Sequence, residues 1–152
     1  MIEILDYEPK FKDAFKNLNY AWIDQYFEIE ATDRQVLENP ESSILEKGGA
    51  IIIASTEQKA VGTCALIKKE PGIYELAKMA VDKAHQGQKI GWKLGVATLE
   101  KAKELKASKV YLESNSQLTP AISLYKKLGF KQVNSGCSPY ERCDVRMEIL
   151  LK

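Results

Sequence analysis

A glycine-bearing stretch near the middle of the chain could hold an anion. It reads MAVDKAHQGQKIGW over residues 79–92 and leads from an apolar run into a helical pattern. The N–H groups of a first helical turn have no partner within the helix and lie at its positive dipole end, so a pyrophosphate fits there. Gly87 and Gly91 let the backbone approach such a ligand, and Lys89 adds a positive charge. Similar turns often bind nothing, so the stretch by itself predicts only a candidate anion site.

Glu75 has the chemistry and the setting of a proton acceptor. It lies in the run Ile73 to Val81, where strand alternation would place it on one face with Ala77, Met79 and Val81. Burial among apolar neighbours disfavours the charged form and raises the pKa of a carboxyl, which suits it to receive a proton. The competing interpretation is a side chain that faces solvent, or one that a strand bulge turns outward.

Tyr125 is a candidate proton donor, because a phenol with an ordinary pKa of about 10 holds a proton at neutral pH that it can give to a basic atom. It lies in a helical stretch that begins with Thr119 as N-cap and Pro120 as first helical residue, and that ends at Gly129. The competing interpretation is a core aromatic on an amphipathic helix.

Two further helices precede the glycine-bearing stretch, and one follows it. The first is expected over 11–27, from five apolar residues at helical spacing: Phe11, Phe15, Leu18, Trp22 and Tyr26. A short second helix is expected with Thr32 as N-cap and Gln35 completing a capping box. The third is expected over Gly91 to Leu105.

Strand-like runs account for most of the remaining chain. They are expected at Ile2 to Asp6, Ala50 to Ala54, Ala60 to Lys68, Ile73 to Val81 and Val110 to Glu113, with an alternating stretch from Cys143 to Leu151 at the end. The order β-α-α-β-β-β-α-β-α-β-β predicts one α/β domain of the α+β type over residues 1–152, with a mixed, mostly antiparallel sheet flanked by helices.

The chain resembles the GNAT superfamily of acyl-CoA-dependent N-acetyltransferases, and two segments carry the resemblance. Gln86 and Gly91 match the ends of that family's pyrophosphate loop, whereas Lys89 stands where the family has a middle glycine. Residues of the second segment are Asn115, Pro120-Ala121-Ile122, Leu124-Tyr125 and Leu128-Gly129-Phe130.

The resemblance implies acetyl-CoA as co-substrate, with its pantetheine arm between the strands at 73–81 and 110–113. The residues implied to bind it are Met79, Val81, Gln86, Gly87, Gln88, Lys89, Ile90, Gly91, Trp92 and Asn115. It also implies Tyr125 as the acid and supports Glu75 as the base. Glu113 is the alternative base, and direct attack by the amine requires no covalent intermediate.

The first two helices and a late loop usually shape the acceptor site in this superfamily. The segment 20–30 combines aromatic rings with carboxylates, which could hold a cationic amine. The resulting substrate-binding candidates are Trp22, Tyr26, Glu113 and Tyr140. Trp22 and Tyr26 also fit a buried helical stripe, which is the competing interpretation.

Composition excludes several other classes of function. A formal charge of +1 gives no net field toward nucleic acid or an anionic membrane, and no apolar run is long enough for a signal peptide or a membrane span. We therefore expect a cytoplasmic protein. Cys64, Cys137 and Cys143 indicate neither a disulfide framework nor a zinc site, and no metal is expected.

The acceptor is expected to be a primary amine of a small metabolite. A protein N-terminus or lysine, and a noncatalytic CoA-binding sensor, are the alternatives. A nucleotide-binding module fits less well, because the loop lacks the lysine-serine ending of a P-loop. The sequence does not determine the oligomeric state and is compatible with a homodimer.

Overall fold

The computed structural model describes residues 1–133 and 143–151. Its seven strands form one mixed sheet in the order β1-β2-β3-β4-β5-β7-β6. Their bounds are Glu3–Asp6, Ala50–Thr56, Lys59–Glu70, Ile73–Val81, Lys109–Ser114, Lys131–Val133 and Val145–Leu150 for β1 to β7. Strands β4 and β5 run parallel, and the other neighbouring pairs of the described strands run antiparallel. The predicted α/β class and mostly antiparallel mixed sheet are confirmed.

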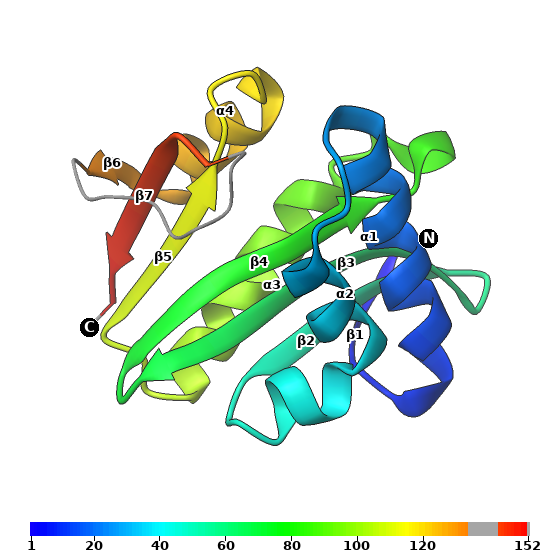
Figure 1. The fold of residues 1–152 in the computed structure, drawn as a ribbon, viewed down its shortest axis with the longest axis horizontal. Coiled ribbons are helices and arrows are strands. Elements are labelled where there is room, and N and C mark those ends of the chain that lie inside the picture. Colours follow the sequence, from blue (N-terminus) through cyan, green and yellow to red (C-terminus); the bar gives the residue numbers. More distant parts are fainter. Residues whose placement is uncertain (134–142, 152) are drawn as a thin grey trace.

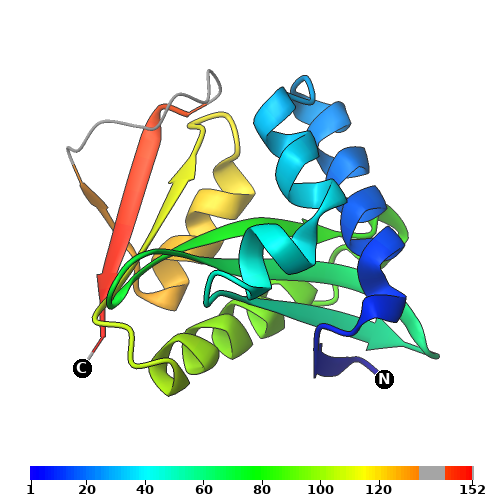
Figure 2. The same ribbon diagram turned by 60° about the horizontal axis from the view of Figure 1, so that its bottom comes forward.

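Helices cover both faces of this sheet (Figures 1 and 2). Helices α1 (Lys12–Tyr26) and α2 (Ala31–Glu38) lie on one face, and α3 (Ile90–Glu104) lies on the other. Helix α4 (Thr119–Leu128) packs on the same core as α3. Short helical turns lie at Pro9–Phe11 (η1), Glu41–Leu45 (η2) and Lys83–His85 (η3). The predicted order of helices and strands is confirmed.

The buried stripe of α1 differs from the one expected. Phe15, Asn19 and Ile23 are buried, whereas the side chain of Tyr26 is 46% exposed and Trp22 is only partly buried. Asn19 tolerates burial because its Nδ2 donates to Phe15 O at 2.9 Å and to Thr63 Oγ1 at 3.0 Å. The side chain of Trp22 packs against the edge of the core and stays partly exposed.

Two expected helix caps were wrong. Helix α2 has Glu30 at its N-cap, with a capping box formed with Asp33 instead of the predicted Thr32 and Gln35. The carboxylates of Glu30 and Asp33 cap the backbone N–H groups as the hydroxyl of Thr32 and the amide of Gln35 would have done. The sequence therefore could not distinguish between helix starts at residues 30 and 32. Helix α4 has Leu118, not Thr119, at its N-cap, while Gly129 ends it at φ +109 as expected.

A bulge at Lys78 changes the face on which the side chains of β4 lie. Lys78 has φ +55, and the register with β3 shifts between the pairs Ala65↔Ala77 and Thr63↔Ala80. One extra residue in a strand inverts the alternation beyond it. The expectation that Glu75 shares a face with Met79 and Val81 was therefore wrong: these two pack against the α3 side, opposite Glu75.

Strands β4 and β5 pair over a short stretch and then separate. Their register covers Ile73↔Lys109, Tyr74↔Val110 and Glu75↔Tyr111, after which the two strands diverge (Figure 1). Beyond this point β4 follows β3, whereas β5 follows β7. A wedge thus opens in the middle of the sheet, as the resemblance implied.

Cys143 is disulfide-bonded, whereas the sequence had indicated only thiols. Pairing requires two Cα atoms within about 7 Å, which sequence spacing does not reveal. Cys64 is a buried free thiol, and burial raises its pKa to about 12. None of the described helices is both long enough and apolar enough to cross a membrane.

Candidate active site

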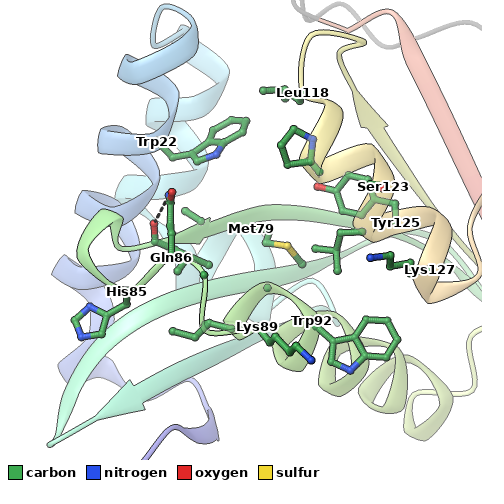
Figure 3. Close-up of a pocket in the computed structure, with 18 of the residues that line it drawn as sticks. Trp22, Met79, His85, Gln86, Lys89, Trp92, Leu118, Ser123, Tyr125 and Lys127 are labelled. Carbon is green, nitrogen blue, oxygen red and sulfur yellow. Dashed lines mark hydrogen bonds between the residues drawn. The ribbon is translucent and has the colours of Figure 1, made fainter.

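A large cleft lies between the end of β4 and the helices α3 and α4, beside the wedge between β4 and β5 (Figure 3). Its volume of ≈ 990 Å³ lies at the upper end of ordinary ligand sites, which hold about 300–1,000 Å³. The floor is formed by Met79, Ala80 and Val81 at the end of β4. We refer to this cleft as the donor cleft.

One wall of the donor cleft is the turn that leads into α3. Gly87 has φ +88, a conformation that glycine adopts without strain, and a Cβ added there would meet only open space. Lys89 is the N-cap of α3 with φ +61, so the N–H groups of the first turn that follows have no partner within the helix. Gln86 reaches back to the strand, since its Nε2 lies 3.4 Å from Val81 O (Figure 3). The turn therefore presents N–H groups and an ammonium to the cleft, as an anion site requires.

The opposite wall is one face of α4. It consists of Pro120, Ala121, Ser123, Leu124, Tyr125 and Lys127. Helices α3 and α4 approach closely because glycines face α4: a Cβ at Gly95 would lie 2.5 Å from Leu128 Cδ1. The outer end of the cleft carries Trp92 and Lys127, on facing helices (Figure 3).

A second, smaller pocket of ≈ 110 Å³ lies on the other face of β4, and we refer to it as the acceptor pocket. Its apolar wall comes from α1 and the segment after it, through Trp22, Ile23 and Phe27. Glu75 on β4 and Glu113 on β5 contribute carboxylates. An apolar wall with two carboxylates is suited to an alkylammonium group.

The donor cleft and the acceptor pocket meet at four shared residues: Trp22, Met79, Leu118 and Tyr125. Trp22 also stacks in a tilted arrangement with Tyr26, with ring centroids 5.4 Å apart. Tyr125 faces Met79 from α4 (Figure 3). A group bound in one cavity can therefore reach a group bound in the other beside the tyrosine ring.

Burial raises the pKa of the Glu75 carboxyl above its ordinary value of 4.5. Lys69 Nζ lies 3.3 Å from Glu75 Oε1 and partly offsets this effect, whereas the nearby Glu113 carboxylate adds to it. The Glu75 side chain is 12% exposed, and that of Lys69 is 44% exposed. The ion pair is consequently the weaker influence, because solvent screens its outer partner.

Burial also raises the pKa of the Tyr125 phenol well above its ordinary range, with a smaller contribution from neighbouring Cys64. The ring packs edge-on against Phe130, with centroids 6.2 Å apart. At neutral pH this hydroxyl therefore holds its proton. It can therefore donate a hydrogen bond where the two cavities meet.

The chain matches the family model described as "Acetyltransferase (GNAT) family" over residues 15–130. This chain belongs to the GNAT family. It is 34% identical over 107 residues to the N-acetyltransferase YjgM of Escherichia coli K12, a match that spans 67% of this chain and 64% of YjgM.

Solved structures of the family share the whole fold. A GNAT-family acetyltransferase from Staphylococcus aureus Mu50 superposes with a TM-score of 0.90 at 27% identity, covering 100% of both chains. The Salmonella typhimurium protein yncA, solved with its cofactor acetyl-CoA, has a TM-score of 0.80 at 19% identity and covers 100% of this chain and 95% of its own.

Most of the residues expected to bind acetyl-CoA line the donor cleft of this GNAT chain: Met79, Val81, Gln86, Gly87, Lys89, Ile90, Gly91 and Trp92. Gln88 does not line it, and Asn115 lies in the acceptor pocket instead. Asn115 shapes the turn before α4, because its Oδ1 accepts from Gln117 N at 2.8 Å.

The expected acceptor residues are divided between the two cavities. Glu75 and Glu113 line the acceptor pocket, Trp22 lines both cavities, and Tyr26 lines the donor cleft. Tyr140 lies outside the described residues.

Several lining residues were missed from the sequence. Ser123 and Lys127 share a helical face with Pro120 and Leu124, so the spacing of three and four would have indicated them. Asn19 and Lys78 in the acceptor pocket had a weaker signal, namely polar residues within an apolar helix stripe and strand.

Proposed function

We propose that this chain transfers the acetyl group of acetyl-CoA to the primary amine of a small molecule. The donor would occupy the donor cleft and the amine the acceptor pocket. The observation that carries this proposal is the meeting of the two cavities at Tyr125 and Met79, with Glu75 in the acceptor pocket. Two separate cavities that share one wall match a reaction between two substrates.

The donor cleft fits an extended molecule with phosphates at one end. The turn at Gly87 and Lys89 suits the pyrophosphate, and Trp92 with Lys127 suits the nucleotide end. The thioester end would then lie at Met79. The relative yncA, solved with acetyl-CoA, supports this choice of donor.

The acceptor pocket fits a small amine better than a large one. At ≈ 110 Å³ it has room for roughly ten water-sized positions, given about 10–15 Å³ for each. Glu75 and Glu113 attract an ammonium group, and the rings of Trp22 and Phe27 pack against its carbon atoms.

The chemistry requires the amine nitrogen to lose two protons and the CoA sulfur to gain one. Glu75 accepts a proton from the ammonium, directly or through water, and the free amine nitrogen attacks the thioester carbonyl carbon. A C–N bond forms and the C–S bond breaks, with the electron pair passing to sulfur. Tyr125 then protonates the thiolate, and the nitrogen gives its second proton to the Tyr125 phenolate, directly or through water. An amide and free CoA are left, Tyr125 is again a phenol, and the proton on Glu75 passes to solvent. Tyr125 supports this role by its place, because it lines both cavities and its phenol holds a proton at neutral pH.

A panel of amines with acetyl-CoA, assayed by release of the CoA thiol, tests the proposal. Short alkylamines, amino-acid amines and peptides with a free N-terminus or lysine form its three arms. We expect turnover in a small-amine arm. Turnover confined to peptides would overturn the small-molecule acceptor, and CoA binding without turnover in any arm would indicate a sensor instead.

A further inference from the structure

A buried ion pair joins α2 to the β4 bulge beside the acceptor pocket. Lys78 Nζ lies 3.1 Å from Asp33 Oδ1, with side chains that are 8% and 0% exposed. The other carboxylate oxygen of Asp33 accepts from Glu30 N at 2.9 Å, in the capping box that starts α2. Asp33 therefore links the N-terminus of α2 to Lys78 in β4.

Stability alone does not account for this pair. The cost of removing two charges from water is similar to what their attraction returns, and apolar replacements of such pairs are often neutral or stabilising. Lys78 also occupies the left-handed region at φ +55, where the Cβ of a residue with a side chain crowds the following carbonyl oxygen. Two costly features at one position point to a functional constraint.

A second set of contacts holds the backbone of the same residue. Thr63 Oγ1 donates to Lys78 O at 2.9 Å, and Asn19 Nδ2 donates to that hydroxyl oxygen at 3.0 Å. Thr63 and Asn19 are both buried. The side chain of Lys78 is thus held from α2, and its carbonyl from β3 and α1.

The bulge lies at the boundary between the two cavities. Before it, Glu75 and Ala77 line the acceptor pocket, while beyond it Met79 and Val81 form the floor of the donor cleft. Without the bulge, strand alternation would put Met79 and Val81 on the same face as Glu75. The relative position of the base and the thioester therefore depends on the bulge.

We propose that Asp33 and Lys78 are positioning residues for acetyl transfer, which hold the β4 bulge so that Glu75 and the donor thioester meet in register. This inference rests on the proposed function of the two cavities. Neither residue exchanges a proton with the substrates; they act through the backbone of β4. Helix α2, which contributes no lining residue to either cavity among the described residues, thereby takes part in catalysis.

The test removes both charges at once. In the double variant Asp33→Asn/Lys78→Met, the introduced amide keeps an oxygen for Glu30 N, and the introduced thioether side chain fills the space of the lysine stem. We expect a folded protein whose KM for acetyl-CoA stays within about twofold, while kcat falls about tenfold to a hundredfold, since small misplacements at a reacting centre have effects of that size. Wild-type kcat in this folded variant would overturn the proposal.

The chain offers a matched control pair. Lys101 Nζ lies 3.1 Å from Asp6 Oδ1, the same distance, but the pair joins α3 to β1 away from both cavities, with side chains 24% and 72% exposed. The variant Asp6→Asn/Lys101→Met should keep wild-type kcat and KM. An equal loss of kcat in this control would show that charge removal, not the bulge, is responsible, and would overturn the proposal.

A second variant covers the case in which the double variant does not fold. Thr63→Val is nearly isosteric and removes only the hydroxyl that donates to Lys78 O. We expect the same split, with a lower kcat and an unchanged KM for acetyl-CoA. Wild-type kcat in Thr63→Val would then count against the proposal.

Amide hydrogen exchange separates this inference from the proposed function, because it needs no acceptor. Exchange over residues 75–81 should be faster in both test variants than in the wild type and the control, in the presence of saturating CoA. If the wild type acetylates no amine, the proposed function fails, yet faster exchange still supports the positioning of β4. Unchanged exchange in both variants overturns the inference even when the wild type is active.

Discussion

Burial acts on the two proton-transfer residues in the same direction but with different consequences. For Glu75 it raises the pKa of a carboxyl, which makes a weak base stronger. For Tyr125 it raises the pKa of a phenol that is already protonated at neutral pH, which keeps the proton on the oxygen but makes the phenol a weaker acid. Tyr125 lines both cavities where they meet, and Glu75 lines the acceptor pocket beside it.

Glu75→Gln tests the base. The carboxyl must be ionised to accept a proton, so wild-type activity should rise as the pH passes the raised pKa of Glu75, above the ordinary 4.5. The variant should lose most of its turnover at neutral pH together with this acidic limb, in rate profiles measured from thiol release. If Glu113→Gln removes the limb and Glu75→Gln does not, Glu113 is the base.

Glu75→Gln should lower activity at neutral pH but raise the stability of the fold. Because the pKa of Glu75 is raised on folding, the folded state binds the proton more tightly, and stability falls as the pH rises from 4.5 through the folded pKa. A neutral amide avoids this loss. Glu75→Gln should therefore melt at a higher temperature than the wild type at pH 7, and the difference should close near pH 4. A lower melting temperature at pH 7 would show that the contact with Lys69 outweighs burial.

Tyr125→Phe tests the acid while keeping the ring and its contact with Phe130. Loss of a positioned general acid lowers kcat about a hundredfold to ten-thousandfold. Binding of CoA, measured by calorimetry, and the melting temperature should hardly change. Tyr7→Phe is the matched control, since the pKa of Tyr7 is also raised by burial, to about 12, and Tyr7 lines neither cavity. Wild-type kcat in Tyr125→Phe would remove Tyr125 from the mechanism.

Among the elements, the turn into α3 is where local backbone conformation matters most for the donor. Gly87→Ala places a side chain at φ +88, which costs about 1–2 kcal/mol. Open space around Gly87 lets the free turn relax, so CoA must restore the binding conformation. We expect CoA to bind about five- to thirtyfold more weakly, by the conversion of about 1.4 kcal/mol per factor of ten.

Gly48→Ala is the control for this prediction, because Gly48 has φ +95 but lies outside both cavities. It should lower the melting temperature without changing the affinity for CoA, as measured by calorimetry. Equal affinity in Gly87→Ala and the wild type would separate the turn from donor binding.

Helices and strands of this chain follow from local patterns, whereas their mutual register does not. The helical spacing of apolar residues was sufficient to predict α3. The alternation of apolar and polar residues was sufficient to predict β7, whose Val145 and Met147 are buried. The bulge at Lys78 depends on Asp33, which lies 45 residues earlier, and on Thr63, which lies 15 residues earlier. No local pattern contains such contacts, so the faces of Glu75 and Met79 could not be assigned correctly from the sequence.

At the scale of the whole molecule, binding of CoA should stabilise the fold. A ligand present at a hundred times its Kd adds about 2.7 kcal/mol to the free energy of unfolding. For a chain of this length that corresponds to about 5–10 °C in melting temperature, at about 2–4 °C per kcal/mol. Thermal scans with CoA up to saturation measure the shift. No shift across a hundredfold range of CoA would contradict donor binding altogether.

The divergence of β4 from β5 gives this sheet an edge in its interior. An ordinary sheet ends only at its outer strands, where unpaired backbone groups invite another strand. Here β4 beyond Glu75 and β5 beyond Tyr111 no longer pair with each other, so the sheet has two such borders facing inward. The arm of CoA carries amide groups, and in this position it would act as the missing strand. Two half-sheets joined along residues 73–75 and 109–111 would then become one continuous sheet that the protein's own substrate completes.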